Sequence, residues 1–468
     1  MFDDDLPSEI VPALRAFAHA LRQHIRTHRD VPLGQHEQGL LAVWRTHAPA
    51  LLEGTLQATT TGLDPQVRPL RERCPRCATA RPFLDGRSRT LNTCLGAITY
   101  ERPWYQCRPC HAGWSPPDRT LGVAAYERTT VGVRTWAAEL GAAHTFAEAQ
   151  ALLAKLAGVH VGEETLRSHA EAIGTALEQR QQAASGHVQA EQEPQAAAAE
   201  PAPGQLVVET DGVMVRYRGT GFHEVKLALV AGCRTGNGRP TRDPAYRPPV
   251  LVRPSYVAAR EPPERFGPRL LAEAARRGAL DVVGWQQPPG TDPRLAGVSG
   301  PALAVLRPVQ VLGDGAVWIW HLAAEHFGDR IEVVDWYHAS EHLWTLAKAL
   351  HGDGTPQTTA WAEQAEHRLW QHGPPALLAW LKDTPAPTAE AATVLPGERG
   401  YFTSNAHRMQ YPHFRRLGLF VGSGAIESGA KHLVQHRLCR AGMRWSQPGA
   451  TAILTLRAHL LSGRPLAA

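Results

Sequence analysis

Two pairs of cysteines constrain most tightly what this chain can fold into. Cys74 and Cys77 form one Cys-x-x-Cys pair, and Cys107 and Cys110 form a second, with 29 residues between the two pairs. Two intervening residues let both thiolates of a tight turn face one ion, and two such turns complete a four-cysteine Zn²⁺ site with no open position for catalysis. Disulfides would need an oxidising compartment, and a redox pair would need no second copy. The pattern predicts one structural Zn²⁺ in a zinc ribbon.

The length and composition indicate several domains. The chain has 468 residues, of which 43% are hydrophobic and 20% charged. No apolar run approaches the roughly 18 residues of a membrane span, and the acidic start of the chain has neither region of a secretory signal. We therefore expect a cytoplasmic, multidomain protein with no membrane partner.

Positive charge gathers in two stretches. Residues 66–120 contain ten Arg and four acidic residues, and residues 401–468 contain nine Arg or Lys and one acid. Surfaces that bind DNA phosphates have such a balance, although an ordinary solvated surface can have it too.

The N-terminal part is predicted to be mainly helical. Large apolar residues recur at three- and four-residue steps from Ile10 to Ile25, which indicates an amphipathic helix. Between residues 125 and 180, two helical stretches joined by a short turn form a helix-turn-helix pattern. Its second helix would present Arg167 and His169 to a DNA groove. A plain helical hairpin remains the alternative, because acidic residues begin that second helix. The segment after it, rich in Ala, Gln, Glu and Pro, predicts a linker or an exposed, fraying helix.

The C-terminal half predicts one mixed sheet with carboxylates on its strands. The order of three antiparallel strands, helix, strand, helix and strand is that of a ribonuclease H-like domain, in which the first and fourth strands lie side by side. The expected elements cover residues 205–217, 224–230, 250–256, 262–277, 308–312, 317–327 and 330–334.

Three carboxylates from separate elements are the candidate catalytic residues. Asp211 lies within the first strand, Asp314 follows the fourth, and Glu427 begins a later helix among small residues. Such a set suits two Mg²⁺ (or Mn²⁺) ions, which take hard oxygen ligands and keep positions for water and a phosphate. A single Asp before Gly is often only a turn residue, and Glu427 could instead pair with Lys431.

Four segments carry a resemblance to a known family. The chain resembles bacterial insertion-sequence DDE transposases of the ISKra type, relatives of the Mutator-like transposases. The matching segments are VVETDGVMV around Asp211, VLGDGAVWIW around Asp314, VVDWYHASEHLW around Asp335 and VGSGAIESGAKHLVQHRLCRAGMRW around Glu427.

The resemblance implies Asp211, Asp314 and Glu427 as the catalytic, magnesium-binding residues. Asp335 and His338 match a D-x-x-H element that follows the second Asp in Mutator relatives, and Asp335 is also the alternative second metal ligand. A helical insertion is implied between Asp314 and Glu427. Basic residues after Glu427 would hold the backbone of a cleaved DNA end, with no sequence preference. These are Lys431, His432, Arg437, Arg440 and Arg444.

The function implied is that of a nucleoid-associated transposase. It would bind terminal inverted repeats and target DNA as a homodimer or higher homo-oligomer, and catalyse DNA cleavage and strand transfer. A ribonuclease H-like nuclease without strand transfer is one alternative, and a non-catalytic, zinc-containing DNA-binding regulator derived from a transposase is another. The expected domains are an α+β set: residues 1–69 (N-terminal helical region), 70–120 (zinc ribbon), 125–180 (helix-turn-helix-like region), 181–204 (linker), 205–345 with 420–468 (ribonuclease H-like catalytic domain) and 346–419 (helical insertion).

Overall fold

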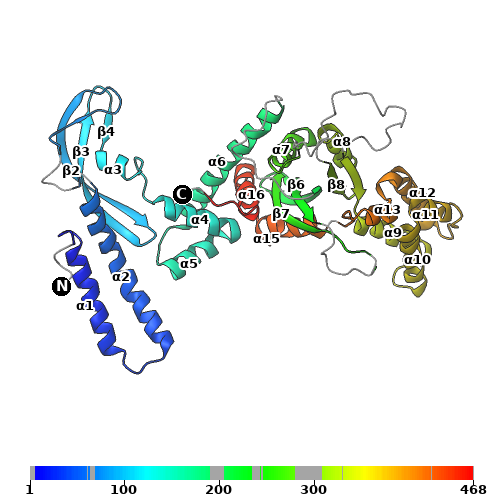
Figure 1. Cartoon of the computed structure of the whole chain (residues 1–468), viewed down its shortest axis with the longest axis horizontal. Coiled ribbons are helices and arrows are strands. Elements are labelled where there is room, and N and C mark those ends of the chain that lie inside the picture. The colour runs from blue at the N-terminus through cyan, green and yellow to red at the C-terminus, as the bar shows by residue number, and fades with distance from the viewer. Residues whose placement is uncertain are drawn as a thin grey trace, which may run out of the picture. The chain divides into compact units, whose positions relative to one another are not determined.

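The chain is an α+β protein with two compact units. Residues 1–172 with 466–468 make up the first unit, and residues 173–465 make up the second. The computed structural model (Figure 1) describes residues 6–60, 62–63, 69–189, 205–234, 243, 246–279, 308–328, 330–422 and 424–466. None of the helices in these ranges combines the length and the apolar character that crossing a membrane requires.

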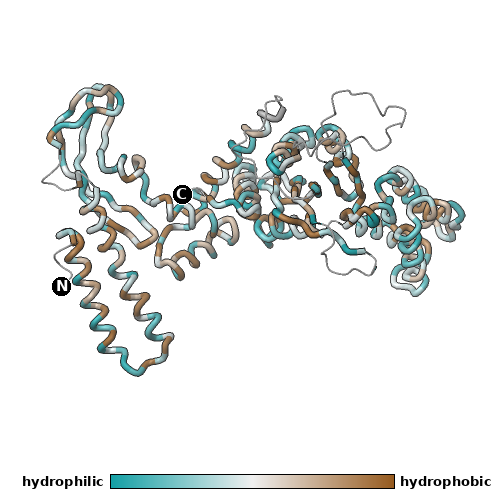
Figure 2. Tube along the Cα trace, in the orientation of Figure 1, coloured by the Kyte–Doolittle hydropathy of each residue, from teal (hydrophilic) through white to brown (hydrophobic). Residues whose placement is uncertain are grey.

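The first unit begins with a pair of helices, α1 (Val11–Thr27) and α2 (Leu33–Thr59). The predicted amphipathic helix corresponds to α1, where hydrophilic and hydrophobic residues alternate (Figure 2). Its Phe17 ring packs edge-on against Trp44 of α2, at 6.1 Å between centroids. A four-stranded antiparallel sheet follows, in the order β1-β2-β3-β4. Its strands are β1 (Arg71–Arg73), β2 (Ala80–Thr93), β3 (Gly96–Cys107) and β4 (Ala112–Trp114).

Four helices follow this sheet. A capping box begins α5 (Phe146–Ala157), because the Thr145 side chain accepts from the Glu148 backbone and the Glu148 side chain accepts from the Thr145 backbone. The helix ends at Gly158, whose φ of 68° suits a residue without Cβ. The helices are α3 (Pro116–Thr120), α4 (Val131–Ala143), α5 (Phe146–Ala157) and α6 (Glu163–Gln189).

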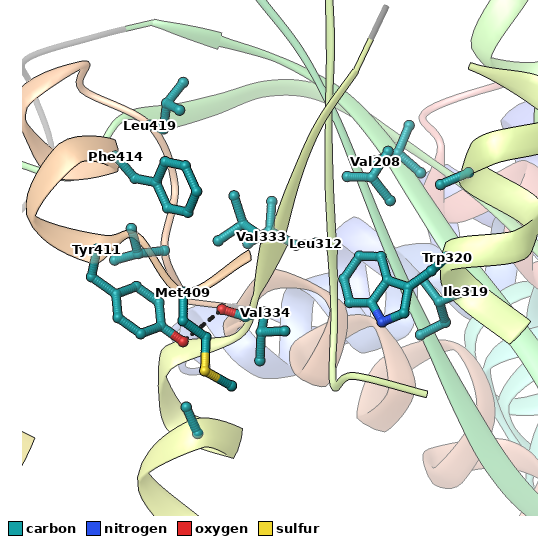
Figure 3. Packing of buried hydrophobic residues seen from close by; sticks show 14 of the residues in the cluster. Val208, Leu312, Ile319, Trp320, Val333, Val334, Met409, Tyr411, Phe414 and Leu419 are labelled. Carbon is teal, nitrogen blue, oxygen red and sulfur yellow. Dashed lines mark hydrogen bonds between the residues drawn. The ribbon is translucent and has the colours of Figure 1, made fainter. Parts of the chain in front are cut away.

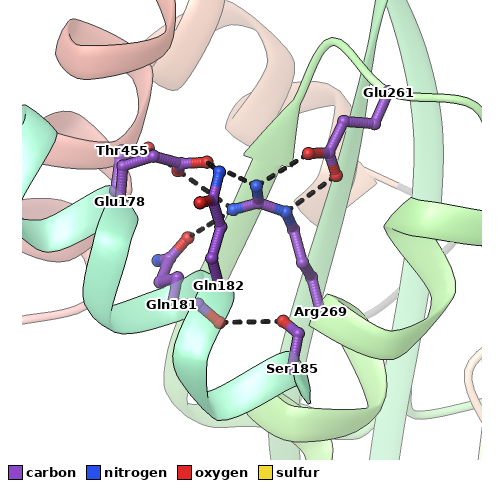
Figure 4. A network of polar contacts seen from close by, with 7 residues as sticks. All are labelled: Glu178, Gln181, Gln182, Ser185, Glu261, Arg269 and Thr455. Carbon is purple, nitrogen blue, oxygen red and sulfur yellow. Dashed lines mark hydrogen bonds and ion pairs between the residues drawn. The ribbon is translucent and has the colours of Figure 1, made fainter. Parts of the chain in front are cut away.

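The expected domain boundary at residue 180 falls inside α6, which continues to Gln189. A buried polar network holds this part of the helix (Figure 4). Arg269 pairs with Glu178 of α6 and, at 2.8 Å, with Glu261, while Thr455 donates to Glu178 at 2.8 Å. Composition predicted a linker or an exposed, fraying helix from residue 181, and the structure has a helix there, with Gln182 and Ala184 exposed. The rest of the predicted linker, residues 190–204, lies outside the described residues.

The second unit is built on a five-stranded mixed sheet in the order β7-β6-β5-β8-β9. The β5–β6 and β6–β7 pairs are antiparallel, and the β5–β8 and β8–β9 pairs are parallel. The predicted sequence of strands and helices is confirmed over this region. The elements are β5 (Gln205–Tyr217), β6 (Gly221–Arg234), β7 (Val250–Ala259), α7 (Pro263–Arg276), β8 (Val309–Gly313), α8 (Val317–His326) and β9 (Arg330–Val334).

The core of this unit forms between the sheet and its helices. Val208 of β5, Leu312 of β8 and Val333 of β9 are fully buried, and α8 contributes Ile319 and Trp320 (Figure 3). All five residues of β8 are buried, including Gln310, whose amide exchanges two hydrogen bonds with the backbone of Phe420, as expected of a strand that is covered on both sides.

A continuous helical segment follows β9. It contacts the core through Tyr411, whose buried hydroxyl donates to the carbonyl of Val334 at 3.0 Å (Figure 3). Tryptophans within it pack on each other, as Trp361 does on Trp380 at 4.7 Å. The expected helical insertion therefore corresponds to helices, although these begin at Trp336. They are α9 (Trp336–His351), α10 (Pro356–His372), α11 (Pro374–Lys382), α12 (Ala389–Ser404), η3 (Ala406–Arg408) and α13 (Tyr411–Arg416).

The last helices return to the sheet. The segment from Gly424 to Leu438 is one helical run whose middle part, η4, has π-helical hydrogen bonding. Such turns are rare and occur often at functional sites. The run consists of α14 (Gly424–Gly429), η4 (Ala430–Gln435) and α15 (His436–Leu438), and α16 (Gln447–Leu461) follows it.

Candidate functional site

The four predicted zinc ligands lie together in the first unit. Cys74 and Cys77 lie in the turn between β1 and β2, and Cys107 and Cys110 lie at the turn between β3 and β4. All four Sγ atoms lie within 4.8 Å of one another, and the Sγ atoms of Cys77 and Cys107 are 3.7 Å apart. A tetrahedral site with Zn–S bonds of about 2.3 Å requires S···S distances of roughly 3.8 Å. The cluster is therefore compatible with a structural Zn²⁺ site.

The surroundings of Cys77 favour its thiolate, the form that binds zinc, whereas the hydrogen bond with Cys77 raises the pKa of Cys110. Hydrogen bonds from the side chain and backbone of Thr79 lower the pKa of Cys77 to about 6. The backbone N–H of Arg76 points to the Cys74 sulfur at 3.4 Å. Cys74 and Cys107 are buried, so this site can bind an ion without offering it to a substrate.

In the second unit, three predicted carboxylates lie at one edge of the sheet. The parallel pairing of β5 with β8 ends at Glu209 and Leu312, and Asp211 and Asp314 lie two residues beyond that pair. The pairing of β8 with β9 ends at Gly313 and Val334, immediately before Asp314 and Asp335. The carboxyl ends of parallel strands lie at the same edge of a sheet, so the pairing register places these three carboxylates near one another.

Charge repulsion shows which carboxylates are neighbours. Burial raises the pKa of Asp211, and the charges of Asp314, Glu427 and Glu224 raise it further, while a hydrogen bond from the Gly212 N–H opposes the shift. Asp211 and Asp314 are half-buried and Glu427 is exposed. The structure therefore brings all three predicted catalytic residues into electrostatic contact in a place that solvent reaches.

Glycine at the helical run of Glu427 allows a close approach to the sheet. An added Cβ at Gly429 would come within 3.0 Å of the Tyr256 ring of β7, and α14 contacts β5 and β6. The small residues around Glu427 thus let its backbone lie against the strand that carries Asp211.

Sequence reasoning missed one acidic residue, Glu209. Its side chain is fully buried and accepts a hydrogen bond from the backbone N–H of Ile426 at 2.8 Å, one residue before Glu427. Burial raises the pKa of Glu209 to about 8, and the charges of Asp335 and Glu427 add to this. The signal was its position two residues before Asp211, on the same face of β5.

Asp335 has a different setting from Asp314. It is 4% exposed and caps α9, where its side chain accepts from the backbone N–H groups of Tyr337 at 3.3 Å and His338 at 3.2 Å. Asp314 is more accessible, and its side chain accepts from the N–H of Ala316 at 2.8 Å. The Asp-x-x-His element thus begins a helix, in which the backbone N–H of His338 donates to the Asp335 carboxylate.

A layer of aromatic and histidine side chains adjoins these carboxylates. The Tyr401 hydroxyl donates to the backbone carbonyl of Asp314 at 3.1 Å, and its ring stacks on His342 at 3.8 Å. His342 in turn contacts a carboxylate oxygen of Glu398 at 2.7 Å. Burial raises the pKa of Tyr401, as do the charges of Asp314 and Asp335, so the phenol stays protonated and keeps its hydrogen bond.

The two DNA-binding residues predicted on α6 both have protein partners. Arg167 forms ion pairs with Glu164 and Glu171 of its own helix. His169 is half-buried, and its Nε2 lies 2.9 Å from the Thr129 hydroxyl. A DNA contact by either residue would compete with these interactions.

The basic residues after Glu427 divide by exposure. Arg437 is 1% exposed, its guanidinium lies 4.8 Å from the centre of the Trp445 ring, and it donates to the sulfur of Met443. The predicted DNA contact of Arg437 is therefore corrected to a packing role. The exposed members of the set are Lys431, His432, Arg440 and Arg444.

The donor set at the sheet edge fits hard divalent cations. Asp211, Asp314 and Glu427 supply only carboxylate oxygens, the ligands that Mg²⁺ prefers. Among the described residues, the cysteines alone form a group of three or more ligand atoms within 4.8 Å of one another. Asp211, Asp314 and Glu427 are not in that group.

Comparisons with known proteins add no assignment. No protein-family model matches the chain, and a search of curated proteins finds no match.

Proposed function

We propose that the chain is a DDE transposase of the insertion-sequence type. One observation carries the proposal: Asp211, Asp314 and Glu427, 216 residues apart at the extremes, share one solvent-accessible sheet edge, where the charges of Asp314 and Glu427 add to the burial that raises the pKa of Asp211. Strand register explains the first two, and the close approach of α14 explains the third. Clustered carboxylates with perturbed pKa values are typical of catalytic sites.

The topology of the sheet supports a ribonuclease H-like catalytic domain. Numbered along the chain, the strands have the order 3-2-1-4-5, with antiparallel pairs on one side of the first strand and parallel pairs on the other. The first and fourth strands are neighbours, as that fold requires. The run of helices from Trp336 to Arg416 then corresponds to the proposed insertion, and residues 205–345 with 420–468 to the domain that it interrupts.

Accessibility favours Asp314 over Asp335 as the second metal-binding residue. Both carboxylate oxygens of Asp335 accept hydrogen bonds from the start of α9, and the side chain is buried. Asp314 is half-buried and next to Asp211. We assign Asp335 and His338 to support: Asp335 fixes the start of α9, and the ring of His338 lies 6.4 Å from that of Tyr401.

Two Mg²⁺ or Mn²⁺ ions held by Asp211, Asp314 and Glu427 would lower the pKa of a bound water or 3′-hydroxyl and stabilise the leaving oxygen. The protein's own part is to fix these carboxylates in space. β5 and β8 hold the two aspartates in register, and Tyr401 anchors the turn after Asp314 through its backbone carbonyl. The exposed Lys431, His432, Arg440 and Arg444 would hold DNA phosphates.

The first unit would supply DNA binding. We propose that the zinc ribbon at 70–120 and the helices of residues 125–180 bind the terminal inverted repeats. Joining two DNA ends would require at least a homodimer. The protein would act at the nucleoid, where its DNA substrates lie. Strand transfer needs no external energy source, because each phosphodiester broken in the joining step is replaced by a new one.

The experiment is Mg²⁺-dependent cleavage and strand transfer on DNA that carries the element's own ends. Wild type is compared with Asp211→Asn, Asp314→Asn, Glu427→Gln and Asp335→Asn. We expect the first three changes to lower the rate at least 1,000-fold, equivalent to about 4 kcal/mol of activation free energy, with DNA binding intact. An active Asp314→Asn variant beside an inactive Asp335→Asn variant would reverse the metal-ligand assignment.

The same assay separates the alternatives. Cleavage without joining of pre-cleaved ends would indicate a ribonuclease H-like nuclease. DNA binding without any cleavage would indicate a zinc-containing regulator derived from a transposase.

A further inference from the structure

A groove in the first unit is lined by arginine and aromatic side chains. It has a volume of about 960 Å³ and lies between one face of the β2–β3 hairpin and the segment that follows β4. Five arginines and two acids line it, a net charge of +3. Its charged lining residues are Arg87, Arg89, Arg102, Arg119, Arg128, Asp118 and Glu127.

The floor of the groove is a buried ion-pair network centred on Asp118. Arg89 donates to the Asp118 carboxylate at 2.7 Å, Tyr100 donates to it at 3.1 Å, and Arg102 also pairs with it. Arg89 donates further to the carbonyl of Ala124 at 2.6 Å. The hairpin and the opposite wall are therefore fixed to each other, and the groove is rigid before any ligand binds.

Above this floor, a tryptophan orders two of the arginines. The guanidinium carbons of Arg87 and Arg102 lie 4.6 and 5.0 Å from the centre of the Trp104 ring. The ring lies against Gly113 of β4, where an added Cβ would come within 2.5 Å of Trp104 Cζ2. Stacking on an aromatic ring leaves the edge of a guanidinium free to donate hydrogen bonds. Asp85 takes up part of this capacity, because it pairs with Arg87 at 3.0 Å.

Two more arginines line the groove with their guanidinium groups available. The side chains of Arg119 and Arg128 are exposed and form no hydrogen bond or ion pair with the residues that the structure describes. Tyr126, beside Arg128, is 98% exposed. Exposed guanidinium groups of this kind are suited to a ligand that carries phosphates.

We propose that this groove binds the sugar–phosphate backbone of double-stranded DNA. Planar guanidinium groups match phosphate oxygens through paired hydrogen bonds, which an ordinary lysine-rich surface does not provide. Ordering by Asp118 and Trp104 lowers the entropy that binding costs. The choice of DNA as the polyanion rests on the proposed function, since the groove chemistry itself recognises a phosphate backbone.

The test measures binding of a labelled 30-base-pair duplex of arbitrary sequence to the full chain, by fluorescence anisotropy with no divalent metal added. The variant is Arg119→Gln with Arg128→Gln. The matched control is Arg22→Gln with Arg26→Gln, which removes two exposed arginines from α1. We expect the groove variant to bind about tenfold more weakly, with the slope of log K against log salt reduced by about 1.8, or 0.9 for each phosphate that is no longer neutralised. The control should match wild type.

Equal binding by the groove variant and wild type would overturn the proposal, as would an equal loss in the control. A loss confined to a single-stranded RNA of 30 nucleotides, with duplex binding unchanged, would overturn it in favour of a different polymer. Cleavage plays no part in this measurement. A chain that never cuts DNA but shows the expected loss in the groove variant would therefore keep the groove and remove the catalytic proposal.

Discussion

The cysteine cluster and the carboxylate site are built in opposite ways. The four cysteines lie within residues 74–110, on turns between neighbouring strands, and their sulfur atoms lie within 4.8 Å of one another. The carboxylates come from three segments between residues 211 and 427, and the charges of Asp314 and Glu427 oppose the ionisation of Asp211. A closed set of soft ligands stabilises its own fold, whereas an open set of like charges is held in place by the rest of the fold. Removing a ligand should therefore have opposite effects on stability at the two sites.

The largest effect should come from Cys107→Ser. Zinc binding to such four-ligand sites is worth on the order of 10 kcal/mol, and Cys107 is fully buried. We expect loss of the zinc and unfolding of the sheet β1 to β4, measured by metal content and by hydrogen exchange over residues 71–114. Cys94→Ser, in the same unit but outside the cluster, should keep one zinc per chain. Equal zinc content in both variants would contradict the four-cysteine site.

The stability of the second unit, whose sheet carries the carboxylates, should depend on the polar network around Arg269 (Figure 4). Glu178→Gln removes one charge from a buried group and should destabilise the second unit by about 3 kcal/mol. The control is Glu163→Gln, at an exposed position of the same helix. Chemical unfolding monitored by hydrogen exchange in α7 and α16 measures the difference. Equal stability of the two variants would show that Arg269 needs only its pair with Glu261.

The same network sets a pH dependence. Burial opposes ionisation of Glu178, but the hydrogen bonds and charge of Arg269 outweigh it and lower the pKa below 4.5. A lowered pKa means that the ionised group stabilises the folded state above pH 4.5 and that this stability is lost as the pH falls through the folded pKa. The stability difference between wild type and Glu178→Gln should therefore shrink below pH 4.5, which acid titration of the unfolding free energy measures.

A smaller effect is expected at Glu209, which holds the start of the helix of Glu427. Glu209→Ala leaves the buried N–H of Ile426 without its acceptor, a cost of about 1–3 kcal/mol. We expect a 10- to 100-fold loss of cleavage and a higher half-saturating Mg²⁺ concentration, with duplex binding unchanged. Glu209→Gln keeps an acceptor and should retain most activity. If the Ala and Gln variants are equally impaired, the charge of Glu209 matters and its hydrogen bond does not.

The smallest expected effect, at Asp211, tests the contrast between the cysteine cluster and the carboxylate site most directly. The raised pKa of Asp211 means that its ionisation costs stability as the pH rises above 3.8, its ordinary value. Asp211→Asn should therefore stabilise the protein by about 1 kcal/mol at pH 8 with no divalent metal added, while abolishing cleavage. Thermal unfolding measures this, and Asp383→Asn, at an exposed position, is the control. A destabilised Asp211→Asn variant would contradict the repulsion.

The sequence predicted the sheet of the second unit well because its apolar runs are long and separated by clear turns. The sequence also predicted that Asp314 follows the end of β8 and that Asp335 follows the end of β9. The parallel pairing of these two strands then places both residues at the same edge of the sheet. Its position two residues before Asp211 was the one local signal for Glu209, but the role of Glu209 could not be predicted, because its partner Ile426 lies 217 residues away.

Composition left two interpretations open for residues 181–189, a linker or an exposed, fraying helix, and α6 continues there to Gln189. Arg269 donates to the Gln181 side chain at 3.4 Å. Arg437 has the charge of a DNA contact, but the face of the helix on which it lies is buried. The charge of a segment gives the number of its cationic side chains but not whether each one faces solvent or the core.

The π-helical turn η4 explains why the face of the helix on which Arg437 lies is hard to predict from the sequence. An α-helix turns by about 100° per residue, and a π-helical turn accommodates one residue more than an α-helical turn does. Glu427 precedes this turn and Arg437 follows it. Deleting one residue from η4 would hardly change charge or hydrophobicity, yet it would rotate the buried guanidinium of Arg437 and its neighbours relative to the Glu427 carboxylate. Natural variation in this helix should therefore be more restricted in length than in residue identity at exposed positions without a proposed role, such as Gln435.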